Sequence, residues 1–262
     1  MQLINNLFKQ GVKMNSKTSI ILISFFLFFT ANHISASEKI HQTYDQLLQK
    51  FVAENLVKYN QFHRSKEDIS TLKKYIVSLE KIDPDKLPKK DALAYWINLY
   101  NAVTLQLILD NYPVESIKDI GGLLSSPWKK KLVTVNGEQL TLNQIENEII
   151  RPKFKDARIH FALNCASIGC PPLAANAYEG RTLDEQLDRA SKLALSNDEW
   201  VKISDKIYIS KIFDWYGQDF IEYSGSVRKY IANYRPDMAE TILDENKEIK
   251  FLDYNWKLNI LQ

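Results

Sequence analysis

Two cysteines, Cys165 and Cys170, are the residues whose type and spacing best suit chemistry. They are the only cysteines in the chain, and the segment between them contains Gly169. In an oxidising compartment, an even pair at this spacing is a candidate for a short-loop disulfide. In a second interpretation Cys165 is a catalytic nucleophile, with His160 as the base that activates its thiol. The residue types alone leave both interpretations open.

The expected local structure argues against direct contact between His160 and Cys165. Apolar and polar residues alternate over 158–163, which predicts a strand with one apolar face made by Ile159, Phe161 and Leu163. In an extended chain that rises about 3.3 Å per residue, His160 and Cys165 lie about 16 Å apart, beyond hydrogen-bond reach. Only a sharp reversal near Asn164 would bring them together.

Polar residues inside apolar segments are further candidates for a site. Asn98 and Asn101 are three residues apart, so they share one face of an otherwise apolar helix. A buried amide left unpaired costs about 1–3 kcal/mol, so these side chains either fix an irregular loop or line a polar pocket. Asp219 follows the aromatic pair at 215–216 and is a candidate to orient a base or to cap a helix. Glu146 and Arg151 are expected to form a surface ion pair and nothing more.

Helices are predicted to position these residues in the first half of the chain. Apolar residues recur at helical spacing over 41–60, 65–82 and 89–111. The third segment is apolar on nearly every side between Ala92 and Leu109, which indicates a buried central helix that ends before Pro113.

The second half mixes short strands with helices. Asn136-Gly137 stands between two short β-prone segments, which predicts a hairpin, and Thr141 with Gln144 has capping-box spacing for a helix that continues to about Ile150. Later segments predict helices at 183–195, 221–233 and 237–243 and strands at 200–203 and 206–209. The fold class is therefore α+β, with a helix-rich N-terminal half packed on a small, mostly antiparallel sheet in a single domain over 38–262.

The N-terminus has the organisation of a secretory signal peptide over residues 1–37, with Met14 as an alternative start. Lys17 precedes an apolar run from Ile20 to Ala31, and small residues follow at 35–37. The run is shorter than the ~20 residues that a bilayer span needs. We therefore expect a periplasmic or secreted protein with no stable membrane span after cleavage.

Composition narrows the function classes. The chain has 34 basic and 32 acidic residues and is 45% hydrophobic, which is typical of a globular protein and excludes a disordered one. It lacks a basic cluster, so nucleic acid is not an expected partner. Its histidines and cysteines lack metal-ligand spacing, so we expect neither metal nor cofactor. The remaining partner class is a small molecule or a peptide.

Four blocks of sequence resemble one known family. They read DALAYWINLYNA at 91–102, RIHFALNCAS at 158–167 with CPPL at 170–173, FDWYGQDF at 213–220 and YNWKLN at 254–259. In this order they resemble the family known as domain of unknown function 547, in its bacterial exported type. The resemblance implies export but no established activity. The chain has Asn255 where the family has an acid. The candidate residues inside these blocks are Asn98, Asn101, His160, Asn164 and Cys165.

Two functional hypotheses follow. In the first, the protein is an exported cysteine-dependent hydrolase or acyltransferase, in which Cys165 attacks, His160 or another histidine acts as base, and Asn98, Asn101 or Asn164 orients that base or binds an oxyanion. In the second, it is a non-catalytic periplasmic module that binds a ligand or a protein, and the cysteines are structural. A disulfide between Cys165 and Cys170 favours the second hypothesis.

Overall fold

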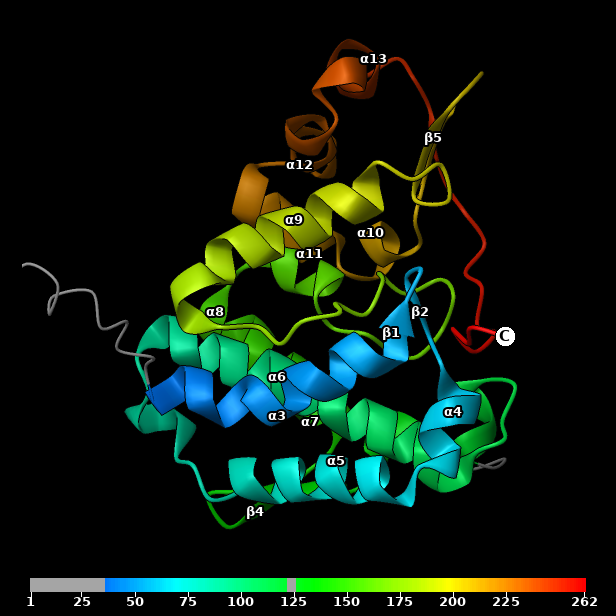
Figure 1. Ribbon diagram of the computed structural model, residues 1–262. Coiled ribbons are helices and arrows are strands. Elements are labelled where there is room, and N and C mark those ends of the chain that lie inside the picture. The colour runs from blue at the N-terminus through cyan, green and yellow to red at the C-terminus, as the bar shows by residue number, and fades with distance from the viewer. Residues whose placement is uncertain (1–35, 122–125) are drawn as a thin grey trace, which may run out of the picture. The chain divides into compact units, whose positions relative to one another are not determined.

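The computed structural model describes residues 36–121 and 126–262, and Ala36–Gln262 constitute one compact unit. The predicted signal peptide lies outside the described residues except for its last two positions. The fold is α+β, rich in helix, with small sheets of two or three strands (Figure 1).

Helices build the first half of the described unit. They are α3 (Ala36–Phe51), α4 (Tyr59–Arg64), α5 (Lys66–Leu79) and α6 (Lys89–Asn111), with single 3-10 turns η2 (Pro84–Lys86), η3 (Ile117–Ile120) and η4 (Pro127–Lys129). The predicted helix over 41–60 is wrong in its second half. Glu54 and Asn55 take positive φ angles there and form the turn of a hairpin between β1 (Val52–Ala53) and β2 (Leu56–Val57).

Helix α6 is the centre of this half, and its predicted bounds are confirmed. Helices α3 and α5 run beside it, and α7 also packs against it (Figure 1). Its side chains are buried from Ala92 to Leu105, because neighbours cover every side of the helix. Among the described residues, it is the one helix long and apolar enough to cross a membrane, and its apolar stretch is buried inside the protein.

The hairpin and the capping box are confirmed. Strands β3 (Val133–Val135) and β4 (Glu138–Leu140) pair antiparallel, and both residues of the Asn136-Gly137 turn have positive φ. Thr141 then caps α7 (Leu142–Gln144), its side chain bonding the Gln144 N–H while Gln144 bonds back. The helix widens into one π-helical turn, η5 (Ile145–Ile150), and ends as α8 (Arg151–Phe154).

The C-terminal half contains a three-stranded sheet among short helices. The helices are η7 (Gly180–Thr182), α9 (Leu183–Leu195), α10 (Ile212–Trp215), α11 (Gly217–Ser224), α12 (Val227–Tyr234), η8 (Pro236–Met238) and α13 (Ala239–Leu243). Strand β6 (Ile207–Ile209) pairs antiparallel with β5 (Val201–Ile203) and parallel with β7 (Ile249–Phe251). The helix predicted over 221–233 is divided in two at Gly225, whose φ of 86° ends α11.

The predicted strand over 158–163 is wrong, because residues 157–161 form a 3-10 helix, η6 (Ala157–Phe161). The Asp156 side chain caps it by accepting the Arg158 N–H. Ile159 packs in the hydrophobic cluster around α6, whereas Phe161 packs in a second cluster formed by β5, β6 and α10–α13. The alternating pattern thus reflects two cores on opposite sides of one helical turn. The estimate of about 16 Å between His160 and Cys165 assumed an extended chain, so it does not hold.

Candidate functional site

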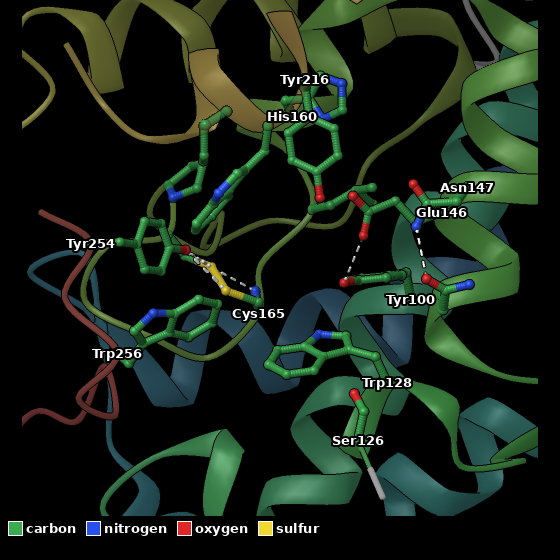
Figure 2. Close-up of a pocket in the computed structure, with 16 residues that line it drawn as sticks. Tyr100, Ser126, Trp128, Glu146, Asn147, His160, Cys165, Tyr216, Tyr254 and Trp256 are labelled. Carbon is green, nitrogen blue, oxygen red and sulfur yellow. Dashed lines mark hydrogen bonds between the residues drawn. A yellow bond between two sulfur atoms is a disulfide. The ribbon is translucent and has the colours of Figure 1, made fainter. Parts of the chain in front are cut away.

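A pocket of about 360 Å³ brings together residues from both halves of the described unit (Figure 2). Aromatic rings make up much of its wall, namely Tyr100, Trp128, Trp215, Tyr216, Tyr254 and Trp256. The polar side chains that line it are Ser126, Asn143, Glu146, Asn147 and His160, and the other lining residues are Cys165, Cys170, Leu163, Pro171 and Ile212. A largely apolar wall with a few convergent polar groups is typical of a small-molecule site.

Glu146 is the one carboxylate among the described residues that line the pocket, and no lysine or arginine accompanies it there. It is 8% exposed and lies in the π-helical turn, a feature found frequently at functional sites. The Tyr100 hydroxyl donates to Glu146 Oε2 over 3.1 Å (Figure 2). Burial raises the pKa of Tyr100 and of Tyr216, and the nearby Glu146 charge raises both further, so both hydroxyls keep their protons.

The predicted surface pair of Glu146 with Arg151 is wrong. Glu146 is buried and forms no ion pair with any described residue. Arg151 instead binds Asp219 with two hydrogen bonds, Nε to Oδ2 over 2.7 Å and Nη2 to Oδ1 over 2.8 Å. Its Nη1 donates to Asn147 Oδ1, which links this ion pair to the pocket wall.

Asp219 orients His160. His160 Nε2 lies 2.8 Å from Asp219 Oδ2, and the imidazole stacks on Tyr216 with ring centroids 4.0 Å apart. Burial would raise the pKa of Asp219, but hydrogen bonds and charge from Arg151 and His160 outweigh it and hold that pKa well below its usual range. The ionised carboxylate only accepts, so the Nε2 atom carries the proton of this hydrogen bond.

Cys165 and Cys170 form a disulfide. Cys170 is 6% exposed, and Cys165 is only partly buried. The Tyr254 hydroxyl lies 3.2 Å from each sulfur. A nucleophilic role for Cys165 therefore needs prior reduction of this bond. The structure places His160 and Cys165 in the same pocket wall without a hydrogen bond between their side chains.

The three predicted asparagines hold loops behind the pocket and do not line it. The Asn98 amide bonds both backbone groups of Tyr178. The Asn101 amide bonds Ala162 O over 2.9 Å and Asn164 N over 2.9 Å. The Asn164 amide in turn bonds Pro171 O and Ala166 N inside the cysteine loop. All three are at most 4% exposed, so the loop-fixing interpretation accounts for their contacts.

The C-terminal tail holds the disulfide loop in place. Ile168 N donates to Lys257 O and Gly169 N to Asn255 O, each over 2.8 Å. A Cβ atom on Gly169 would lie 3.0 Å from Asn255 N, tighter than most Cβ contacts, so glycine favours this close approach. The same tail supplies Tyr254 and Trp256 to the pocket, and the Tyr254 ring packs on Trp215.

The acidic and aromatic residues that define the pocket were not among the predicted site residues. Glu146 follows Leu142 by four residues, and Leu142 is fully buried. The capping box fixes the start of the helix, and the four-residue spacing places Glu146 on the same helix face as Leu142. The sequence therefore indicated that Glu146 points inward. Among the described residues, no cluster of three or more histidine, cysteine or acidic side chains could hold a metal ion.

The fold and the pocket define an α+β protein with an aromatic, singly acidic cavity beside a disulfide. Residues 84–193, less than half of the chain, match the model of the family described as Protein of unknown function, DUF547. This match supports the family resemblance of the first two blocks, and the blocks at 213–220 and 254–259 lie outside it. No curated protein and no solved structure matches the chain.

Proposed function

We propose that this chain is an exported binding module whose pocket takes a small organic cation. The observation that carries the proposal is the Glu146 carboxylate, which is buried in an aromatic pocket whose described lining contains no lysine or arginine; the nearby Arg151 forms its ion pair with Asp219. Export is part of the proposal and rests on the signal-like N-terminus and on a disulfide, a bond that persists in oxidising compartments.

A buried carboxylate without a counterion is unfavourable, because burial removes its hydration. The hydroxyls of Tyr100 and Tyr216 both interact with this carboxylate, and neutral donors compensate only part of that cost. A ligand with an ammonium group would supply the missing charge. The pocket therefore favours a cation over a neutral or an anionic ligand.

The aromatic wall fits the same ligand class. Tryptophan and tyrosine rings attract cations through the negative potential of their faces, and cages of such rings recognise quaternary ammonium groups. Trp256 already shows this behaviour within the chain, since Lys118 Nζ lies 3.9 Å from its ring centroid. Trp128 packs edge-on against Trp256, so two indoles lie together in the pocket wall.

The hydrolase or acyltransferase hypothesis has less support. It needs a free thiol at Cys165, whereas the sulfur is bonded to Cys170. It also needs a base within reach, and His160 bonds Asp219 rather than Cys165. The second hypothesis, a non-catalytic binding module, requires neither feature.

Titration with choline, monitored by tryptophan fluorescence and by calorimetry, tests the proposal. We expect choline to bind, and its uncharged tert-butyl analogue, in which carbon replaces nitrogen, to bind at least about tenfold more weakly. Glu146→Gln should weaken choline binding by about ten- to hundredfold, because it removes a charged partner and keeps the side-chain shape.

Glu148→Gln is the matched control, since Glu148 lies in the same π-helical turn but is exposed. It should leave choline binding unchanged. The proposal fails if the uncharged analogue binds as well as choline, if neither binds, or if the Glu146 and Glu148 variants behave alike.

A further inference from the structure

The disulfide opens onto the pocket. Both cysteines line the cavity, and Cys165 is the more exposed of the two. Figure 2 shows the disulfide at Cys165 beside Tyr254. A molecule in the pocket can therefore reach the sulfur–sulfur bond. A crosslink that only stabilises the fold does not need to be accessible in this way.

Hydrogen-bond donors converge on the sulfur of Cys170. The Cys165 backbone N–H donates to Cys170 Sγ over 2.9 Å. The Tyr254 hydroxyl lies 3.2 Å from this sulfur and the Ser167 hydroxyl 3.6 Å. The same two hydroxyls lie 3.2 and 3.1 Å from Cys165 Sγ, so the Cys165 N–H is the donor that distinguishes Cys170. Burial raises the pKa of Tyr254, so this hydroxyl keeps its proton and remains a donor. A disulfide sulfur is a weak acceptor, whereas a thiolate is a strong one, so these donors stabilise Cys170 most after the bond breaks.

We propose that Cys165–Cys170 is a thiol–disulfide exchange centre for a thiol-bearing molecule bound in the pocket. The thiolate of that molecule attacks Cys165 Sγ and forms a mixed disulfide. The Sγ–Sγ bond breaks, and its electron pair remains on Cys170 as a thiolate held by the Cys165 N–H, Tyr254 and Ser167. The proposal goes beyond the cation site and does not depend on it.

A second thiol completes the exchange. It attacks the sulfur of the bound molecule, releases Cys165 as a thiolate, and leaves as a disulfide with the first thiol. In sum, two thiols become one disulfide and lose two electrons, while the protein disulfide gains them and, with two protons, becomes two thiols. The reverse steps return the oxidised protein when a disulfide-bearing molecule binds.

The asymmetry of the two sulfurs decides which one is attacked. Both cysteines line the pocket, but Cys165 is the more exposed of the two, whereas Cys170 is buried and its sulfur accepts the Cys165 backbone N–H. Exchange is fastest when the leaving sulfur is a stabilised thiolate, so attack at Cys165 with Cys170 leaving is the favoured direction.

The test follows native protein in reduced glutathione, with thiols trapped by iodoacetamide and located by mass spectrometry. We expect the disulfide to be reduced while near-ultraviolet circular dichroism stays native, at a rate proportional to glutathione concentration. With oxidised glutathione, the Cys170→Ser variant should form a mixed disulfide at Cys165. The Cys165→Ser variant should react on the order of tenfold more slowly at the buried Cys170.

Tyr254→Phe tests the donors, with Tyr208→Phe on strand β6 as the control. Loss of the Tyr254 hydroxyl should slow reduction by about three- to tenfold, and Tyr208→Phe should not change it. If Tyr254→Phe does not fold, Ser167→Ala takes its place. The proposal is overturned if reduction occurs only on global unfolding, if the two single-cysteine variants react equally, or if the folded donor variant reacts at the wild-type rate.

Discussion

The substitution Asp219→Asn removes the charge that holds His160 and Arg151 beside the pocket. The wild-type carboxylate accepts two hydrogen bonds from Arg151 and one from His160, all between 2.7 and 2.8 Å. Asparagine keeps the size of the side chain but presents one oxygen and an amide that opposes the Arg151 or His160 donors. The variant therefore tests the network without opening a cavity.

The size of the effect follows from burial. The side chains of Arg151 and Asp219 are 27% and 24% exposed, so the pair lies between the surface and the interior. Exposed pairs are worth up to about 1 kcal/mol, and breaking a buried pair costs about 3–5 kcal/mol. We expect Asp219→Asn to lower the free energy of unfolding by about 2–3 kcal/mol, which corresponds to a fall in Tm of roughly 5–10 °C.

The pH dependence gives a second readout. The pKa of Asp219 is depressed in the folded state, so its contribution to stability is fully present above the unfolded value of about 3.9 and is lost as the pH falls further. Urea denaturation from pH 7 to pH 3 should show a gap between wild type and variant that is constant above about pH 5 and shrinks toward pH 3.

Asp214→Asn is the control, because Asp214 is exposed and pairs with Lys211 across one helical turn. It should cost less than about 1 kcal/mol. The reasoning is refuted if Asp219→Asn costs no more than this control, or if the gap between wild type and the Asp219 variant does not shrink in acid.

Two further predictions concern buried residues outside the pocket lining. His41 Nδ1 lies 2.7 Å from the Tyr75 hydroxyl, and burial lowers the pKa of His41 to about 4. Because the unfolded ring titrates near 6.5, the unfolded state binds more protons than the folded state between pH 4 and pH 6.5. Urea denaturation should therefore show that this residue makes the protein about 3 kcal/mol less stable at pH 4 than at pH 7. A His41→Leu variant with the same pH dependence as wild type contradicts this prediction. Asn101→Ala leaves the buried backbone groups Ala162 O and Asn164 N unpaired, so it should lower the unfolding free energy by about 3 kcal/mol. Thermal and urea unfolding measure this loss against the exposed control Asn246→Ala. Equal stability of these two variants contradicts the loop-fixing role.

Local rules predicted the elements that depend on local sequence. Helix α6, the Asn136-Gly137 hairpin, the Thr141 cap and helix α9 follow from hydrophobic periodicity, positive-φ turn residues and capping spacing. Interactions between residues close in sequence determine these elements, so the sequence alone was sufficient to predict them.

The pocket could not be predicted in the same way, because distant contacts build it. The pattern at 158–163 fits a strand, yet Ile159 and Phe161 alternate because they pack into different cores. The spacing from Leu142 indicates that Glu146 faces inward, but no spacing rule locates the π-helical turn or names the aromatic residues, distant in sequence, that surround Glu146. The sequence left both roles of Cys165 open, since the tail 254–259 that holds its loop lies far along the chain.

A crystal structure of the protein with choline bound tests the central claim most directly. We expect the quaternary nitrogen inside the pocket, within about 6 Å of the centroids of at least two aromatic rings and facing the Glu146 carboxylate. Choline bound outside the pocket, or a Glu146 carboxylate that turns away to pair with a basic side chain of the protein, would contradict it.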